Sequence, residues 1–182
     1  MSAHEDSDST NPDALSGSPD TFRIDPATTA DVPEILSMIR ALAEYEKLSH
    51  LCVATEADIA RHLFITHRIE VLLGRRNDQP VCFALFFHNF STFLGKPGLY
   101  LEDLFVRPEF RRHGYGRAML VELARLAVQR GCGRFEWSVL DWNEPAIRFY
   151  QSLGATVLPD WHITRVTGPA LAALATHGAQ GA

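Results

Sequence analysis

A short basic loop with two glycines, placed between an apolar strand and an amphipathic helix, is the feature that most constrains the fold of this chain. The strand is predicted over Leu99–Val106, and the helix over Gly116–Arg130, where apolar side chains recur at helical spacing. Gly131 follows the last turn, where a left-handed C-cap is expected. The apolar segment Phe135–Leu140 comes next. A strand, a crossover helix and a second strand predict parallel pairing of the two strands.

The pattern elsewhere completes a mixed α/β sheet flanked by helices. The stretch 76–80 has turn composition between two apolar runs and predicts a β-hairpin, and the stretch 95–98 predicts a second turn. Three consecutive strands followed by alternating strands and helices indicate a sheet that is antiparallel first and parallel at the crossover. Further strands are predicted at Phe22–Ile24, Ile69–Leu73, Val81–Phe87, Ala155–Leu158 and His162–Val166, and further helices after a cap at Asp31, from Thr55, over Asn143–Leu153 and near Pro169–Ala175.

Charge divides the chain at residue 21. Residues 1–21 contain five acids, no Lys or Arg and no apolar run, which predicts a flexible acidic tail without a secretory signal. Residues 22–182 are predicted to form a single domain, in which 17 acids balance 17 bases, so the net charge of -5 comes from the tail. Nothing approaches the roughly 20 apolar residues of a membrane helix. We therefore expect a cytoplasmic protein that binds neither membranes nor, lacking a basic patch, nucleic acid.

Cysteine and histidine spacing indicates no metal site. Cys52, Cys82 and Cys132 are far apart and form no C-x-x-C pair, so they are predicted to be small buried side chains in a reducing cytosol. His62 and His67 are five residues apart, which does not place both on one helical face as an i, i+4 metal pair requires. We predict that no metal is bound.

The loop before the helix has the composition of an anion site. At a helix start, several backbone N–H groups have no acceptor within the helix, and the helix dipole adds positive potential. Gly114 and Gly116 allow a ligand to approach the backbone closely, and Arg111, Arg112 and Arg117 add positive charge. Together these features suit a pyrophosphate.

Other interpretations of the loop can be compared with this one. The dinucleotide fingerprint G-x-G-x-x-G requires Gly or Ala where Met119 stands. The ATP-binding loop requires Gly and Lys followed by Ser or Thr, and the loop lacks that sequence. On these residues alone, a solvated turn with ordinary surface arginines stays open as an alternative.

Two motifs resemble the coenzyme segments of the GNAT superfamily of N-acetyltransferases. Arg111-x-x-Gly114-x-Gly116, after a strand, is similar to the motif that holds the acetyl-CoA pyrophosphate in that family. Asn143, followed seven residues later by Tyr150, resembles the second coenzyme segment. The resemblance covers residues 22 to about 167 and implies a GNAT-like fold. It implies that acetyl-CoA is bound by Leu104, Phe105, Val106, Arg111, Arg112, His113, Gly114, Tyr115, Gly116, Arg117 and Asn143.

Three further segments resemble the spermidine/spermine and thialysine acetyltransferase branch of this superfamily: Ala43–Glu46, Tyr100–Asp103 and Leu140–Asn143. In that branch, acids at these strand positions face the amine, and the enzymes are homodimers. The resemblance implies a small cationic amine as the acceptor, such as a polyamine, a diamine or a lysine-like molecule. The residues that it places around this amine are Tyr45, Glu46, Glu102, Asp103 and Trp161.

The chain departs from this branch in two places. Ser91 stands where, on a rough matching, these enzymes tend to have an acid, and the stretch Gly154–Trp161 is shorter than theirs. Both departures leave the selectivity for polyamines open.

No cysteine near the motifs suggests an acyl-enzyme, so direct acetyl transfer in a ternary complex is expected. Freeing the lone pair of an alkyl amine at pH 7 costs roughly 4–5 kcal/mol, so a proton acceptor is needed, and Glu102 is the candidate. Glu102 and Asp103 are adjacent on a strand and face opposite sides unless a bulge splays it. A backbone N–H of Leu104 or Phe105 is expected to stabilise the oxyanion that forms at the carbonyl, and Tyr150 to protonate the departing thiolate.

These assignments have alternatives. Glu102 can pair with a neighbouring base, Tyr150 can be a core aromatic one turn after Ile147, and Tyr45 and Trp161 can belong to the core. The chain can also be a catalytically idle acetyl-CoA-binding module, or a peptide or protein N-acetyltransferase. The presence of both Glu102 and Tyr150 argues against an idle module.

Overall fold

The fold is given by a computed structural model that describes residues 21–176. The predicted acidic tail over residues 1–21 lies outside the described residues except for Thr21. The described residues fall into two compact units, one ending at Ser138 and the other beginning at Val139, and each is described by itself. No helix in the described part of the chain is long and apolar enough to cross a membrane.

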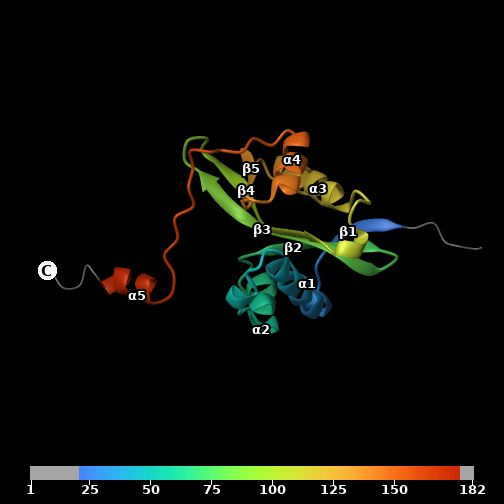
Figure 1. The fold of residues 1–182 in the computed structure, drawn as a ribbon, viewed down its shortest axis with the longest axis horizontal. Coiled ribbons are helices and arrows are strands. Elements are labelled where there is room, and N and C mark those ends of the chain that lie inside the picture. Colours follow the sequence, from blue (N-terminus) through green and yellow to red (C-terminus); the bar gives the residue numbers. More distant parts are fainter. Residues whose placement is uncertain (1–20, 177–182) are drawn as a thin grey trace, which may run out of the picture. The chain divides into compact units, whose positions relative to one another are not determined.

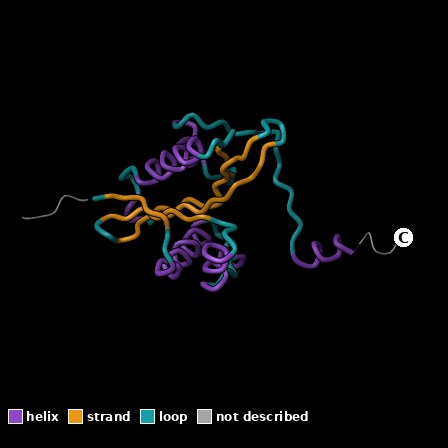
Figure 2. The backbone as a smooth tube through the Cα atoms, turned by 180° about the vertical axis from the view of Figure 1, so that it is seen from behind, coloured by secondary structure: helices purple, strands orange, loops and turns teal. Residues whose placement is uncertain are grey.

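The first unit is built on a five-stranded mixed sheet with the order β1-β2-β3-β4-β5. Neighbouring strands are antiparallel as far as β4, and β5 runs parallel to β4, which confirms the predicted α/β class. Helices α1 and α2 cover one face of the sheet and α3 covers the other (Figures 1 and 2). The strands are β1 (Phe22–Pro26), β2 (Glu70–Arg76), β3 (Gln79–Ser91), β4 (Lys96–Val106) and β5 (Arg134–Trp137); the helices are α1 (Val32–Tyr45), α2 (Glu56–Ala60), which continues as a π-helical turn (Arg61–Ile65), and α3 (Tyr115–Gln129).

An apolar core lies on each face of the sheet. Under α1 and α2, buried side chains of both helices pack against those of β2, β3 and β4, among them Leu73, Phe83, Leu85 and Phe105. On the other face, α3 buries the apolar stripe that predicted it: Met119, Leu120, Leu123 and Ala127. The sequence periodicity therefore identified the buried face of α3, although Leu126, the fifth apolar residue of this stripe, is only partly buried.

The predicted hairpin joins β2 and β3. Asn77 and Asp78 have φ values of 48° and 67°, as a two-residue type I′ turn requires. The second predicted turn is displaced toward the N-terminus, because residues 96–98 already belong to β4. Pro97 is tolerated near the start of this strand, where its missing N–H costs least.

A β-bulge interrupts β4 at Glu102. Leu101 pairs with Phe86 and Asp103 pairs with Leu85, so Glu102 has no partner of its own on β3. The sequence analysis allowed for a bulge as an alternative to strict alternation of side chains, and the structure has this bulge.

The bulge changes which side chains of β4 share a face. Asp103 lies opposite Leu85, whose side chain is in the core under α1, and Tyr100 lies opposite Phe87, two residues further along β3. Residues directly opposite in an antiparallel pair point to the same face. Tyr100 and Asp103 therefore both point to the α1 face, although they are three residues apart.

Pairing between β4 and β5 is short. It runs from Gly98 opposite Arg134 to Leu101 opposite Trp137 and ends there. The strand predicted over Phe135–Leu140 was thus too long, since residues 138–140 leave the ladder. Within the described residues, the part of β4 beyond Leu101 has no strand along this edge.

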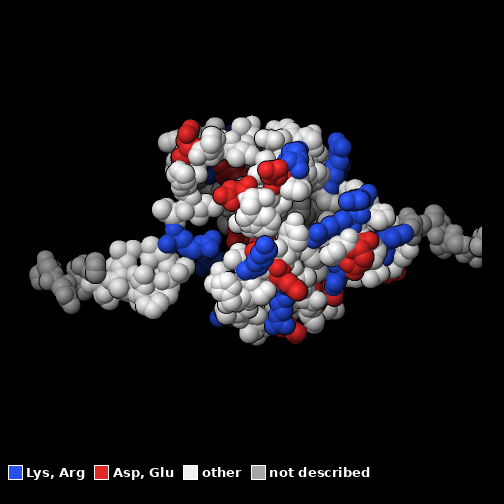
Figure 3. Space-filling view, viewed as in Figure 1, with Lys and Arg blue, Asp and Glu red and all other residues white. Residues whose placement is uncertain are grey.

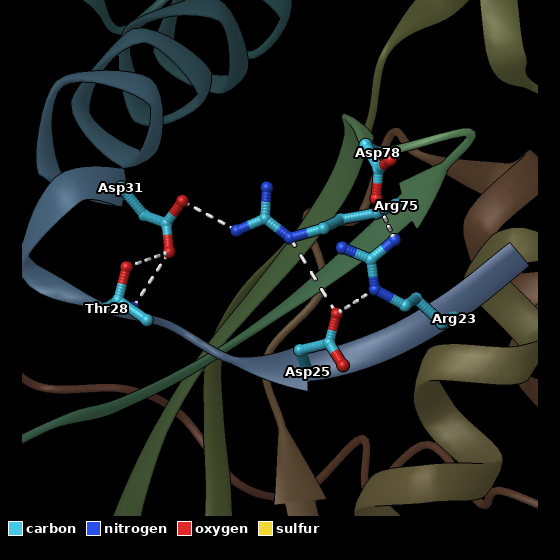
Figure 4. A network of polar contacts seen from close by, with 6 residues as sticks. All are labelled: Arg23, Asp25, Thr28, Asp31, Arg75 and Asp78. Atoms are coloured by element: carbon cyan, nitrogen blue, oxygen red, sulfur yellow. Dashed lines mark hydrogen bonds and ion pairs between the residues drawn. The ribbon is translucent and has the colours of Figure 1, made fainter.

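Charged side chains join the start of α1 to β1 and β2 (Figure 4). Arg75 donates to the Asp31 carboxylate at 2.6 Å and lies 3.8 Å from that of Asp25. Arg23 continues the network, 2.7 Å from Asp25 and 2.5 Å from Asp78. Alternating charges of this kind fix the hairpin edge against the helix.

Asp31 does not cap α1 as predicted. Its carboxylate accepts hydrogen bonds from the backbone N–H and the hydroxyl of Thr28, both at 2.8 Å, and so closes the preceding 3-10 turn. Burial opposes ionisation of Asp31, but the hydrogen bonds from Arg75 and Thr28 outweigh it, and the pKa lies below its ordinary value of 3.8. The cap predicted at Thr55 is confirmed, with Asp58 completing a capping box.

The second unit contains α4 (Glu144–Ser152) and α5 (Gly168–Thr176), close to the predicted helices. Asn143 caps α4, accepting the N–H of Ala146 at 3.4 Å. The two strands predicted at Ala155–Leu158 and His162–Val166 are wrong, because residues 155–167 are irregular. A strand needs a neighbouring backbone, and no strand is present among the described residues of this unit.

Candidate active site

The loop at residues 111–117 presents backbone N–H groups at the start of α3. The first backbone bond of the helix joins the N–H of Ala118 to the carbonyl of Gly114 at 3.0 Å, so the N–H groups of residues 115–117 have no acceptor within it. Gly114 and Arg112 both have left-handed backbone, with φ values of 81° and 67°. Such turns direct successive N–H groups to one side and form an anion-binding concavity.

Other side chains of the loop frame this concavity. Arg112 and Arg117 are exposed and form no ion pair with any residue that the structure describes. The ring of His113 is stacked on that of Tyr115, with centroids 5.6 Å apart, and its Nδ1 lies 2.9 Å from the carbonyl oxygen of Arg111. The positive charge predicted for the loop is therefore present at its surface.

Arg111 is tied to the rest of the site instead of projecting into solvent. Its Nε donates to the carbonyl of Val106 at 3.1 Å. Its guanidinium lies 4.7 Å from the ring centroid of Tyr45 and 5.8 Å from that of Phe105. Arg111 thus joins the loop to the end of β4 and to the last residue of α1.

The unpaired edge of β4 has outward-pointing backbone groups. The N–H of Arg107 donates to the Val81 carbonyl of β3 at 3.0 Å. Backbone direction alternates along a strand, so the N–H of Phe105 also points to β3, whereas those of Leu104 and Val106 point to the edge that β5 leaves unpaired. Of the two predicted oxyanion donors, this geometry favours Leu104.

Three carboxylates gather between the end of α1 and the bulge. Burial, followed by the charges of Glu102 and Glu46, raises the pKa of Asp103 to about 6. Burial also raises the pKa of Glu46, which follows the last residue of α1. A carboxylate with a pKa near 6 is mostly ionised at pH 7 and is a stronger base than an ordinary aspartate, which suits it to accept a proton.

The remaining predicted residues are distributed over both units. Tyr45 is half-exposed beside Arg111, in the first unit. In the second unit, Asn143 caps α4, Tyr150 is half-buried on α4 with its ring 5.4 Å from that of Phe149, and Trp161 is exposed. The structure therefore joins the acids, Tyr45 and the loop within one unit.

The cysteines and the candidate metal ligands show whether thiol or metal chemistry is available in the described residues. Cys82 is buried, and burial raises the pKa of its thiol to about 12, so it is an inert core residue as predicted. Cys52 and Cys132 are only half-buried. Among the described residues, no group of three or more His, Cys, Asp and Glu side chains could hold a metal ion.

Sequence reasoning gave no role to Tyr100, although it lies within a quoted segment. Its ring centroid is 5.2 Å from that of Phe87. Its hydroxyl oxygen is 2.9 Å from that of Ser138, the residue that follows β5. Only the bulge brings Tyr100 to the face of Asp103, and no signal in the sequence locates the bulge.

Comparison with known proteins decides the family. A family model described as acetyltransferase (GNAT) family matches residues 36–155, which include most of α1, the acids, the loop and α4. The chain belongs to this family. It is accordingly an N-acetyltransferase, and the mixed sheet with α3 after β4 is the fold of the family.

Two relatives are similar over most of their length. An L-ornithine N5-acetyltransferase of Arabidopsis thaliana is 36% identical, covering 84% of this chain and 87% of that one. A thialysine N-epsilon-acetyltransferase of Sus scrofa is 37% identical, covering 82% and 94%. A solved structure, an integron cassette protein from the mobile metagenome of V. cholerae, matches with a TM-score of 0.71 at 24% identity over 85% of this chain and 97% of that one, which supports the fold alone.

Proposed function

We propose that this chain transfers the acetyl group of acetyl-CoA to a primary amine of a small cationic molecule by direct attack in a ternary complex. The observation that carries the proposal is the position of three carboxylates beside the unpaired edge of β4, two of which, Asp103 and Glu46, have a raised pKa. The two relatives act, by their names, on ornithine and thialysine, which are both small amines.

The loop and strand edge fit acetyl-CoA, which supplies the acetyl group as an activated thioester. The N–H groups of residues 115–117 are free to bind a pyrophosphate, and Arg112 and Arg117 add charge. A Cβ on Gly116 would lie 3.6 Å from the Val106 side chain, an ordinary van der Waals contact, so packing does not require glycine there, and its proposed role is to let a ligand approach the backbone closely. The N–H of Leu104 is placed to donate to an oxyanion at the unpaired edge.

The acids serve the amine. Glu102 is exposed and Asp103 and Glu46 are half-buried, so an ammonium group entering from solvent meets negative charge at each depth. The raised pKa makes Asp103 the better proton acceptor, and Glu102 then attracts the ammonium group. Tyr150 is proposed to protonate the thiolate, because a phenol still carries its proton at pH 7; transfer to a thiolate whose conjugate acid has a pKa near 8.5 is uphill by only roughly 2 kcal/mol.

A homodimer is proposed with this function from the resemblance to the polyamine and thialysine branch, and a cytoplasmic location from the sequence pattern. The interspersed acidic and basic side chains on the face of the first unit in Figure 3 agree with a small-molecule acceptor better than with a nucleic acid. A peptide acceptor is the second candidate, and an idle coenzyme-binding module is the third.

An amine panel tests the function. Protein and acetyl-CoA are mixed with spermidine, putrescine, thialysine, lysine or a short peptide, and thiol release is followed. We expect turnover with at least one of the small cationic amines and none with the peptide. Activity on the peptide alone, or on uncharged aryl amines alone, would contradict the proposal, and absence of any turnover with intact coenzyme binding would indicate an idle module.

Glycine substitutions test the coenzyme loop. Gly114→Ala and Gly116→Val should lower acetyl-CoA affinity at least tenfold, about 1.4 kcal/mol, because a side chain blocks the approach to the N–H groups. Gly131→Ala is the matched control: it has a φ of 68° at the opposite end of α3, so its backbone strain resembles that at Gly114, with a φ of 81°. Isothermal titration should show normal affinity in the control, and equal affinities of Gly114→Ala and Gly131→Ala would sink the assignment.

The acids predict a pH profile. Because Asp103 must be ionised to accept a proton and its pKa is about 6, kcat/KM should rise with pH through about 6. Glu102→Gln removes a charge that raises this pKa, so the acidic limb should move to lower pH, and Asp103→Asn should abolish the limb and most of kcat. Asp103→Asn should also unfold at a higher temperature at pH 7, since an acid with a raised pKa destabilises the fold when ionised. An unchanged profile in Asp103→Asn would exclude it as the base.

Tyr150→Phe separates catalysis from packing. It keeps the ring and removes the proposed acid, so acetyl-CoA binding should persist while kcat drops by about the 10²–10⁴-fold typical of losing a general acid. The smaller value is reasonable because water can protonate a thiolate whose conjugate acid has a pKa near 8.5. The comparison is kcat against melting temperature in one variant, and near-normal kcat with saturating coenzyme would remove Tyr150 from the mechanism.

A further inference from the structure

A second charged group lies on the same face of the sheet as Asp103. Asn89 of β3 is opposite Gly98 of β4, which is in turn opposite Arg134 of β5. Glu136 lies two residues after Arg134, opposite Tyr100. Since Tyr100 and Asp103 share the α1 face, Asn89, Arg134 and Glu136 extend that face beyond the three carboxylates.

Arg134 and Glu136 form an ion pair with unused bonding capacity. Arg134 Nε lies 2.9 Å from Glu136 Oε2, and Asn89 Nδ2 donates to the same oxygen at 3.2 Å. The Nε of Arg134 and the Oδ1 of Asn89 are buried without a hydrogen-bond partner, so the ion pair is close but not aligned as a hydrogen bond. Both charged side chains remain about a third exposed, at 35% and 34%.

The terminal nitrogens of Arg134 and the second oxygen of Glu136 are therefore open to a ligand. Neither the terminal nitrogens of Arg134 nor the Oε1 atom of Glu136 forms a hydrogen bond with any residue in the described part of the chain. A guanidinium presents parallel N–H groups that match a carboxylate, and a carboxylate oxygen accepts from an ammonium.

Gly98 allows this group to form. A Cβ at Gly98 would lie 2.2 Å from Asn89 Oδ1, closer than real side chains approach, and 3.1 Å from Arg134 Cγ, a tight contact. Only glycine lets Asn89 and Arg134 converge over β4 from the two neighbouring strands. The arrangement is thus built into three strands of the sheet and is not a chance contact between mobile side chains.

We propose that Arg134 and Glu136 bind the α-carboxylate and α-ammonium of a diamino acid whose side-chain amine is acetylated beside Asp103. This inference rests on the proposed function and names its acceptor class. Because of the bulge, Asp103 and Tyr100 lie opposite Leu85 and Phe87, two residues apart on β3, so they are separated by roughly 7 Å at about 3.3 Å per residue, and Glu136 is directly opposite Tyr100. A chain of a few methylene groups with a hydrogen bond of about 3 Å at each end spans such a distance.

The charge of the group discriminates between acceptors. The zwitterionic end of an amino acid presents one group of each sign and matches one Arg and one Glu. A diamine or polyamine presents a second ammonium, which Glu136 attracts but Arg134 repels. The pair therefore favours an α-amino acid over the diamine that lacks its carboxylate.

Matched acceptors test the inference directly. Ornithine and putrescine differ only in the α-carboxylate, as do lysine and cadaverine. The wild-type enzyme should have a kcat/KM at least tenfold higher for the amino acid of each pair. Arg134→Gln should lower kcat/KM for ornithine or lysine about 10- to 100-fold, chiefly through KM, and leave the value for the diamine unchanged or raise it, because the repulsion of the second ammonium is removed. Glu136→Gln should weaken lysine but not Nα-acetyl-lysine, which lacks the α-ammonium.

Arg125→Gln is the control, because it removes an exposed arginine of α3 whose ion-pair partner in the described part of the chain is Glu122. It should change kcat/KM for neither the amino acids nor the diamines. If Arg134→Gln does not fold, Arg134→Lys keeps the charge without the forked geometry and should lose part of the preference. Equal use of putrescine and ornithine by the wild type, or equal losses on both in Arg134→Gln, would overturn the inference while leaving acetyl transfer intact. If no amine is acetylated, the proposed function itself fails.

Discussion

Pairing between β4 and β5 stops at Leu101, and the site depends on this interruption. If β5 continued beside β4, it would form hydrogen bonds with the outward-pointing N–H and carbonyl groups of Leu104 and Val106. Instead the bulge at Glu102 and the early end of β5 leave them at an open edge, next to the loop that begins α3. The sheet is thus paired on both edges of β4 up to Leu101, and backbone groups that can bind a ligand follow immediately after it. The placement of Asp103 follows from the same irregularity, because the extra residue puts it on the face of Tyr100.

The sequence predicted those parts of the fold that local rules determine. Helical periodicity located α1, α3 and α4, turn composition located the Asn77–Asp78 hairpin, and glycine spacing located the anion loop. What it could not predict depends on partners distant in the chain. The two strands predicted between residues 155 and 166 have alternating apolar and polar side chains, but the described residues of their unit contain no strand with which they could pair. The bulge is a property of the β3–β4 register, and the contact of Arg111 with Tyr45 joins residues far apart in sequence, so neither has a local signal.

Charge in this unit is arranged in two contrasting ways. Around Asp31, each carboxylate has a cationic neighbour, and the pKa falls as a result. Around Asp103, burial and then the charges of Glu102 and Glu46 raise the pKa, and the described residues form no ion pair with Asp103. The first arrangement stabilises the native chain, whereas the second opposes it and is retained at the edge where backbone groups are unpaired. Groups that destabilise a fold while facing solvent are typical of sites that await a ligand of opposite charge.

Arg111 shows how the loop can be ready before any ligand arrives. Its side chain is fixed by a backbone carbonyl on one side and two aromatic rings on the other, so the loop is fastened at its first residue to β4 and to α1. Conformational freedom of the loop is consequently lost when the chain folds, not when the ligand binds. Association then proceeds with a smaller entropic penalty, and its rate should be governed by diffusion and charge instead of by a search among loop conformers.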